Sequence, residues 1–237
     1  MDNLERFLAV MEYKSVDRVP HWELGVWPQT VERWAREGLA PLSLHWDWFS
    51  GEAALGMDPR EFIQFNGDML PPFQYGVLAE DERTVTFRDE KGIVRQALKE
   101  GSIGHFRMSM DRFVDFPVKT MQDWRDVKKR FDPVTPQRYE PNWRQTRVEG
   151  WRRRRHPLIF GRNCSTVGFY WFARELMGTE GLSYAWYDQP ALVHDIMESH
   201  ASFLIEASRP ILECTSLEYI CLNEDLAMKN GPLLSPR

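Results

Sequence analysis

The sequence predicts an α/β fold, and two observations support this. Short apolar runs alternate along the chain with segments whose apolar residues recur at helical spacing, an order typical of strand–helix units rather than of separate helical and sheet domains. Four such units fit into the 237 residues, half the number in an eightfold barrel. With 43% hydrophobic residues, the chain can bury a large core without disulfides or a structural metal.

The N-terminal part of the chain contains four elements of this alternation. Helical spacing of apolar residues predicts a first helix over residues 3–13, and Pro28 and Gly38 bracket a second over residues 30–37. Short apolar runs predict strands at Val19–Trp22 and at Phe62–Phe65.

A β-hairpin is the clearest local signal. The β-rich run Thr84–Arg88 and the return run Ile93–Leu98 are separated by the turn Asp89–Gly92. Charged residues flank both runs, so we expect a surface hairpin inserted over residues 77–98.

The C-terminal part repeats the strand–helix order. Thr120 and Asp123 resemble a capping box that opens a helix reaching Phe131. Further helices are predicted over residues 142–155 and 166–177, the latter ended by Gly178, and from Pro190 to a kink or end at Pro210. Strands are predicted at Pro157–Gly161 and Glu218–Asn223.

Composition narrows the class of protein. The 30 Lys and Arg residues against 35 Asp and Glu residues give a net charge of −5, which argues against nucleic-acid or anionic-membrane partners. We find no run of 18 apolar residues and no signal peptide. The three cysteines form no CxxC pair, which suits a reducing cytoplasm. These features predict a cytoplasmic protein.

Several residue groups have competing interpretations. The run Arg152–Arg155 is better explained as a solvated helix end than as an anion site, and no spacing indicates a metal site within these residues. Asp68 and Asp225 each follow a predicted strand, where either a barrel active site or a turn cap accounts for them. An N-terminal tryptophan cluster fits a pocket for a flat ligand and core packing equally well: Trp22, Trp27, Trp34, Trp46 and Trp48.

Three stretches together resemble the uroporphyrinogen decarboxylase family, which includes cobalamin-linked thiol methyltransferases. The first is ERFLAVMEYKSVDRVPHWE, with its Asp-Arg-x-Pro step at residues 17–20. The second is MGTEGLSYAWYDQPALVHDIMESHASFLIEASRPIL, and the third is NEDLAMKNGPLLSPR, with an Asn-Gly-Pro-x-x-Ser-Pro turn. The resemblance implies a TIM-type (β/α)8 barrel, with residues 1–237 as one barrel domain incomplete at its C-terminus.

The resemblance also implies site residues. The stretch FNGDMLPPF is similar to the decarboxylase segment that presents an aspartate to the substrate, which makes Asp68 the candidate catalytic residue. Glu23, Glu224 and Asp225 are expected to face the pocket and bind substrate. The decarboxylases place two arginines after their first strand, whereas residues 21–27 here contain none, and Glu23 would repel a polycarboxylate.

Three functional hypotheses follow. The first is a diverged family enzyme near the corrinoid-dependent methyltransferase branch, whose substrate is a small molecule and whose partner is a methylated corrinoid protein. A full-length relative of that kind would use zinc and a corrinoid, with zinc ligands beyond this chain. The second is uroporphyrinogen decarboxylase itself, acting on a tetrapyrrole. The third is an inactive fragment or assembly protein, because a half barrel exposes sheet edges that favour a homodimer. We expect little activity from the 237 residues alone.

Overall fold

The computed structural model describes residues 1–23, 25–26, 28–39, 55–100, 102–103, 106–107, 110–161 and 168–235. Three members of the N-terminal tryptophan cluster, Trp27, Trp46 and Trp48, lie outside the described residues, as do Cys164 and the Pro236 that ends the Asn-Gly-Pro-x-x-Ser-Pro stretch. The fold is mixed α/β, with parallel and antiparallel sheets. The chain divides into two compact units, the first comprising residues 1–65, 139–163 and 208–221, and the second the remaining residues.

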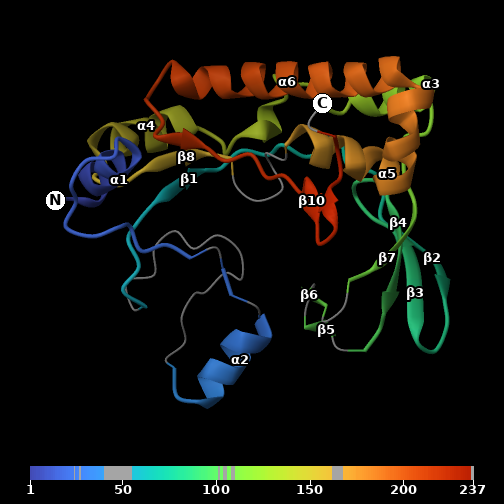
Figure 1. Ribbon diagram of the computed structural model, residues 1–237, viewed down its shortest axis with the longest axis horizontal. Coiled ribbons are helices and arrows are strands. Elements are labelled where there is room, and N and C mark those ends of the chain that lie inside the picture. The colour runs from blue at the N-terminus through green and yellow to red at the C-terminus, as the bar shows by residue number, and fades with distance from the viewer. Residues whose placement is uncertain are drawn as a thin grey trace. The chain divides into compact units, whose positions relative to one another are not determined.

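A three-stranded parallel sheet forms the centre of the first unit. Its strands are β1 (Glu61–Ile63), β8 (Leu158–Phe160) and β9 (Tyr219–Ile220), in the order β1-β8-β9 (Figure 1). All three residues of β8 are buried, as expected for the middle strand of a parallel sheet. In the described part of the chain these strands form an open sheet and not a closed barrel.

The helices of the first unit begin and end where local signals place them. Helix α1 (Asn3–Met11) starts with a capping box between Asp2 and Glu5, and it ends before the predicted residue 13 because Tyr13 adopts a positive φ of 57°. Helix α2 (Pro28–Arg36) is followed by Gly38 at φ 99°, which confirms the predicted end signal. Helix α4 (Trp143–Arg153) buries Trp143, Val148 and Trp151.

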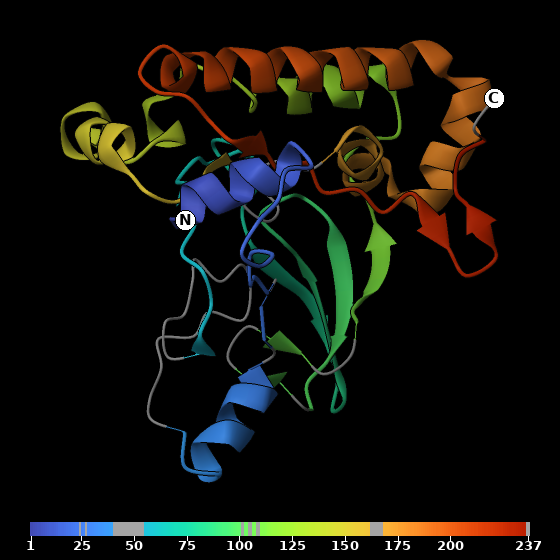
Figure 2. The same ribbon diagram turned by 60° about the vertical axis from the view of Figure 1, so that its left-hand side comes forward.

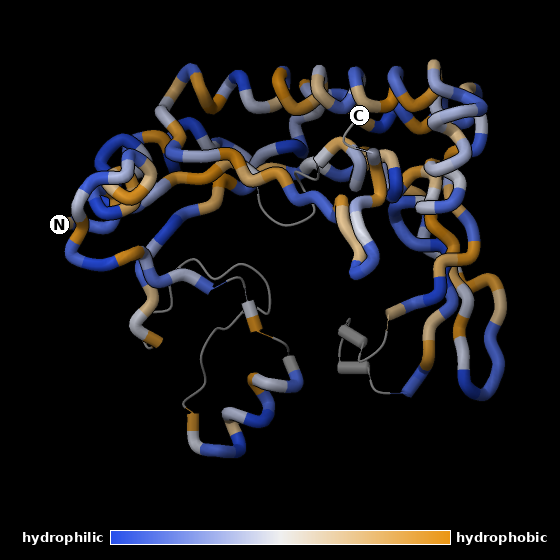
Figure 3. The backbone as a smooth tube through the Cα atoms, viewed as in Figure 1, coloured by the Kyte–Doolittle hydropathy of each residue, from blue (hydrophilic) through white to orange (hydrophobic). Residues whose placement is uncertain are grey.

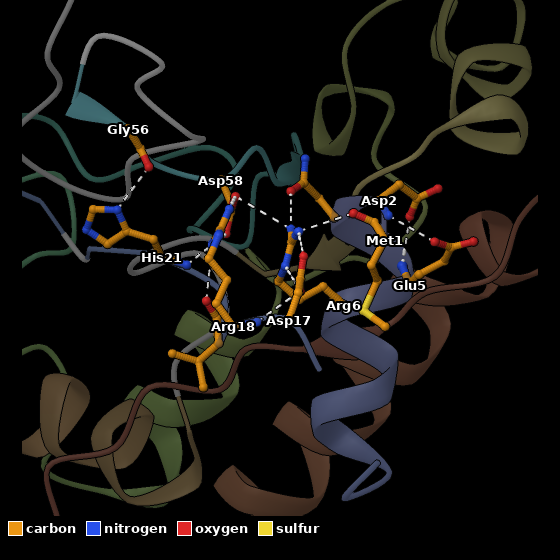
Figure 4. A network of polar contacts seen from close by, with 11 residues as sticks. Met1, Asp2, Glu5, Arg6, Asp17, Arg18, His21, Gly56 and Asp58 are labelled. Carbon is orange, nitrogen blue, oxygen red and sulfur yellow. Dashed lines mark hydrogen bonds and ion pairs between the residues drawn. The ribbon is translucent and has the colours of Figure 1, made fainter. Parts of the chain in front are cut away.

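The predicted strand at residues 19–22 is not a strand. His21 instead lies beside Asp58, whose N–H donates to the His21 carbonyl at 2.9 Å and whose carboxylate accepts from the His21 N–H at 2.8 Å. The Asp58 carboxylate therefore accepts the hydrogen bond that a backbone carbonyl of a neighbouring strand would otherwise accept from His21. The Asp58 carboxylate also accepts two hydrogen bonds from Arg18, each at 2.6 Å, and Arg6 joins the network through Asp17 (Figure 4).

A four-stranded antiparallel sheet belongs to the second unit. Strands β2 (Gly76–Glu80), β3 (Thr84–Arg88), β4 (Val94–Leu98) and β7 (Arg112–Asp115) lie in the order β2-β3-β4-β7, and Figure 2 shows their twist. The pairing of β3 with β4 confirms the predicted hairpin. The hairpin is not a simple surface decoration, however, because Phe87, Ile93 and Ala97 are buried.

Three helices supply much of the core of the second unit. Helix α3 (Met121–Lys128) starts with the predicted Thr120–Asp123 capping box. The span of α5 (Phe169–Asp188) is interrupted at Gly178, where φ is 75°, so the predicted helix end is confirmed and a second helical stretch follows. Their buried side chains form one cluster with those of α6, which includes Trp124, Phe172, Leu176, Leu182, Leu192 and Ile196.

Helix α6 (Pro190–Leu212) runs past the predicted break, with Pro210 inside its last turn. Figure 3 shows hydrophilic and hydrophobic residues alternating along it, as in an amphipathic helix. The smaller elements are β5 (Ser102–Ile103), β6 (Phe106–Arg107), the 3-10 helix η2 (Pro136–Arg138), β10 (Ala227–Met228) and β11 (Gly231–Pro232). Within the described ranges, no helix combines the length and apolar character needed to cross a bilayer.

Candidate functional site

The first two turns of helix α5 connect three of the four predicted site residues. Glu224 and Asp225 contact this stretch directly, and Asp68 reaches it through Lys91 and Glu175. All of these residues belong to the second unit. Glu23 belongs to the first unit, where its backbone carbonyl accepts a hydrogen bond from Arg60 Nη2 at 2.6 Å.

Glu224 caps the N-terminus of α5. Its carboxylate accepts hydrogen bonds from the backbone N–H groups of Tyr170 at 3.1 Å and Trp171 at 2.9 Å, which the start of a helix leaves without intrahelical partners. A Cβ at Gly168 would lie 2.1 Å from the Glu224 side chain, so a larger residue at position 168 would displace the Glu224 carboxylate from this cap. Glu224 therefore holds the segment after β9 against α5.

Asp225 pairs with a cation on the same helix. Its Oδ2 lies 2.9 Å from Arg174 Nη2, and the Arg174 guanidinium lies 5.3 Å from the centre of the Trp171 ring. The Asp225 side chain is 58% exposed. The carboxylate is thus reachable from solvent, with its charge offset by one arginine.

Asp68 occupies a turn whose backbone is firmly held. Its N–H donates to Asn66 Oδ1 at 2.9 Å, and the Arg138 guanidinium donates to the carbonyls of Asn66 and Asp68. Arg138 is only 1% exposed and also donates to the carbonyls of Arg130 and Asp132. This buried arginine fixes the main chain of Asp68 while leaving the side chain 53% exposed.

Lys91 lies between two carboxylates. Its Nζ is 2.7 and 2.9 Å from the two carboxylate oxygens of Glu175 and 3.9 Å from Asp68 Oδ1. The lysine comes from the β3–β4 turn and the glutamate from α5, so the hairpin contributes to this cluster. Sequence analysis missed both residues, and no spacing in the chain links them.

The surroundings of Asp68 raise the pKa of its carboxyl group above the ordinary value. Loss of water around the carboxyl group is the main cause that raises its pKa above the ordinary value, and the negative charge of Glu175 adds to the rise. The positive charge of Lys91 acts in the opposite direction. A raised pKa and an exposed side chain are features that Asp68 shares with carboxyl groups that transfer protons in active sites.

The described residues do not provide a metal site at this position. In the ranges that the structure covers, no group of three His, Cys, Asp or Glu side chains converges as metal ligands would. The cations Lys91 and Arg174 are already paired with carboxylates, so the cluster around α5 is on balance anionic.

In the run Arg152–Arg155, three arginines are exposed, as a solvated helix end predicts, whereas Arg154 forms a buried ion pair with Glu218. The partner glutamate lies just before β9, far from the arginine run in the sequence, so the run alone did not reveal it.

Trp22 packs against Phe7 and Tyr219 with ring centres 5.3 and 6.4 Å apart, which favours core packing for this tryptophan.

Each unit also contains a cavity. The one in the first unit has a volume of about 370 Å³ and lies between β1 and α4, lined by residues that include Glu61, Tyr139, Trp143 and Arg147. The one in the second unit has a volume of about 340 Å³ and is lined from α3 and α6 by residues that include Trp124, Asp195 and Phe203. The described residues that line them include none of the predicted site residues.

Comparison of the chain with protein-family models, with curated protein sequences and with solved structures finds no match in any of the three.

Proposed function

We propose that the chain is a diverged enzyme of the uroporphyrinogen decarboxylase family, near its corrinoid-dependent methyltransferase branch, and that Asp68 is its proton-handling carboxyl group. The family assignment rests on the Asp-Arg-x-Pro step at residues 17–20, the stretch around Asp68, and the Asn-Gly-Pro turn after β9. The proposal includes a (β/α)8 barrel, to which the parallel order β1-β8-β9 is suited, and a cytoplasmic location.

The observation that carries the proposal is the environment of Asp68. Its backbone is fixed by buried Arg138, its side chain is 53% exposed, and its pKa is raised mainly by loss of water. A carboxyl group of this kind can accept a hydrogen bond from a substrate N–H or transfer a proton at the reacting centre.

The charges around α5 favour a neutral or cationic substrate. Asp68, Glu175, Glu224 and Asp225 gather there, and Lys91 and Arg174 are engaged with two of them. A polycarboxylate such as uroporphyrinogen needs free cations, which this cluster does not offer. Uroporphyrinogen decarboxylase itself therefore remains the second candidate, supported by the position of Asp68 alone.

The described residues do not fit a zinc site, so we derive no step through zinc. In the methyltransferase version a methylated corrinoid partner supplies the methyl group. The residues of this chain then bind the acceptor and control one proton at Asp68.

A binding experiment on the full chain tests the proposal. Tryptophan fluorescence is followed during titration with methylcobalamin, which is uncharged overall, and with uroporphyrin, which is a polycarboxylate. We expect methylcobalamin to quench the fluorescence, and the Asp68→Asn variant to bind it at least about tenfold more weakly, equivalent to a loss of about 1.4 kcal/mol. Asp126→Asn is the matched control, because Asp126 is 59% exposed on α3 and outside the cluster.

Two outcomes would overturn this version. Absence of methylcobalamin binding would reject the methyltransferase branch. Conversion of uroporphyrinogen to coproporphyrinogen by the chain, lost in Asp68→Asn, would establish the decarboxylase instead.

A further inference from the structure

We propose that the β3–β4 turn supplies a positioning residue to the Asp68 site: Lys91, held by Glu175, sets the charge state of Asp68. The inference deepens the proposed function and rests on it for its catalytic consequence. The geometry that supports it does not depend on the identity of the substrate.

The turn that carries Lys91 is held by its own hydrogen bonds. The carboxylate of Asp89 accepts hydrogen bonds from the N–H groups of Lys91 at 3.0 Å and Ile93 at 2.9 Å, and from Arg95 Nε at 2.7 Å. Gly92 completes the turn at φ 81°, a conformation that favours glycine. The Lys91 backbone is thus held in place by contacts that do not involve its side chain.

The turn is also docked against the segment that follows Asp68. The Phe73 N–H donates to the Glu90 carbonyl at 2.8 Å, and a Cβ at Gly92 would lie 2.8 Å from the Phe73 ring. Ile93, the next residue, is 1% exposed. These contacts join residues 90–93 to the chain that begins at Asp68, so the ammonium of Lys91 is held at a fixed place near that carboxylate.

The side chain of Lys91 is shared unequally between two carboxylates. Its ammonium lies 2.7 Å from Glu175 and 3.9 Å from Asp68, and the side chains of Lys91 and Glu175 are only 25% and 22% exposed. Charges at such distances and such partial burial interact more strongly than exposed ones. Glu175 therefore positions the cation and at the same time opposes its effect on Asp68.

Two further charged groups face Asp68. Glu90, in the same turn, acts in the same direction as Glu175, and Arg138, whose guanidinium binds the Asp68 carbonyl, acts in the same direction as Lys91. Because Arg138 is held by four backbone carbonyls, its position is set by the fold. Lys91 and Glu175 act on Asp68 through their side chains alone, so substitutions at these two positions can change the charge near Asp68 without removing contacts to its backbone.

The two members of the pair have opposite effects on Asp68. Removing the lysine charge leaves the effect of Glu175 on Asp68 unopposed by Lys91, so the Asp68 carboxyl group must hold its proton to higher pH. Removing the glutamate charge removes a group that opposes the effect of Lys91 on Asp68, so the proton must leave at lower pH. If the ion pair had only a structural role, replacing Lys91 or replacing Glu175 would change the titration of Asp68 in the same direction, because each substitution breaks the same contact.

Carbon-13 NMR titration of the Asp68 carboxyl group in the full chain tests this directly. We expect the titration midpoint to move to higher pH in Lys91→Met and to lower pH in Glu175→Gln, and to remain near that of the parent chain in Lys91→Arg. Lys99→Met is the matched control, since Lys99 pairs with Glu80 at 2.7 Å beside the same sheet and should leave the midpoint unchanged. Movement in the same direction in both variants, or no movement, would overturn the proposal.

The NMR readout separates this inference from the proposed function. If the midpoints move as expected but methylcobalamin does not bind, the role of Lys91 stands and the methyltransferase assignment fails. If methylcobalamin binds, the pH dependence of its affinity should shift in the same two directions. Binding with an unaltered pH profile in both variants would reject the part of the inference that concerns the ligand.

Discussion

Arg154 and Glu218 form a buried ion pair that joins the end of α4 to the start of β9. Arg154 Nη2 lies 2.6 Å from Glu218 Oε1, and their side chains are 6% and 7% exposed. Glu218 Oε2 also accepts a hydrogen bond from the Leu158 N–H at 2.6 Å, where β8 begins. One carboxylate thus links the helix end to two parallel strands.

The variant Glu218→Ala should be strongly destabilised. It leaves a buried guanidinium without its carboxylate, which costs about 3–5 kcal/mol. Urea-induced unfolding followed by circular dichroism measures the loss. Arg153→Ala is the control, because the pair between Arg153 and Glu149 is 79% and 73% exposed and contributes only about 0.5 kcal/mol. Equal effects of the two substitutions would contradict the importance of burial.

Acid should weaken the first unit through Asp58. Hydrogen bonding to Arg18 is the main cause that lowers the pKa of Asp58 in the folded chain. Asp58 therefore binds a proton more readily in the unfolded chain than in the folded chain. The ionised Asp58 carboxylate stabilises the folded chain fully above about pH 4, and this contribution is lost as the pH falls through the folded pKa. We expect the free energy of unfolding to fall less steeply with acid in Asp58→Asn than in the parent chain.

Urea unfolding at a series of pH values checks this dependence. Glu149→Gln serves as the control, because the Glu149 side chain is 73% exposed on α4. A parallel acid dependence in the parent chain and Asp58→Asn would assign the acid sensitivity to other groups.

Two glycines should respond oppositely to alanine. Gly92 has φ 81° and lies against the Phe73 ring, so Gly92→Ala should cost at least about 1–2 kcal/mol. Gly150 lies inside helix α4 with open space around its Cβ position, so Gly150→Ala should stabilise the chain by about 0.5–1 kcal/mol. Thermal unfolding of both variants compares them, and destabilisation by Gly150→Ala would contradict the described helix.

Arg138 should prove essential to the turn at Asp68. Arg138→Met removes a donor from four carbonyls. Those of Arg130 and Asp132 still accept from the N–H groups of Leu70 and Thr135, whereas those of Asn66 and Asp68 lose the Arg138 donor. Buried acceptors without donors cost about 1–3 kcal/mol each, so we expect a loss of at least about 2 kcal/mol. Arg138→Lys keeps the charge, but a single ammonium does not reproduce the planar fork, so an intermediate loss is expected. Urea unfolding ranks the variants, and full stability in Arg138→Lys would show that charge alone suffices.

Local elements of this fold were predictable because their causes lie within a few residues. The Thr120–Asp123 capping box, the hairpin around Asp89–Gly92 and the helix end at Gly178 all depend on neighbouring backbone groups. The strand predicted at residues 19–22 was wrong because a side chain, Asp58, takes the place of a strand partner. No local sequence pattern reveals that a side chain distant in sequence will replace a strand as hydrogen-bond partner.

The candidate site could be predicted only in part. Asp68, Glu224 and Asp225 were found from their positions after strands and from a family resemblance, which remains a prediction. Lys91, Glu175 and Arg138 were missed, because the contact between Lys91 and Glu175 spans 84 positions and that between Arg138 and Asn66 spans 72. Their meeting depends on how the hairpin, α5 and the turn pack together.

The sequence by itself determined the local signals, such as the Thr120–Asp123 capping box, the hairpin turn at Asp89–Gly92 and the interruption at Gly178, because capping side chains and glycine torsions act over one or two turns of chain. Only the tertiary structure decided which charges meet: Lys91 with Glu175, and Arg154 with Glu218. The physical reason is that a buried charge requires a partner, and many acidic and basic residues in the chain could serve. Packing of the apolar surfaces brings one particular pair together.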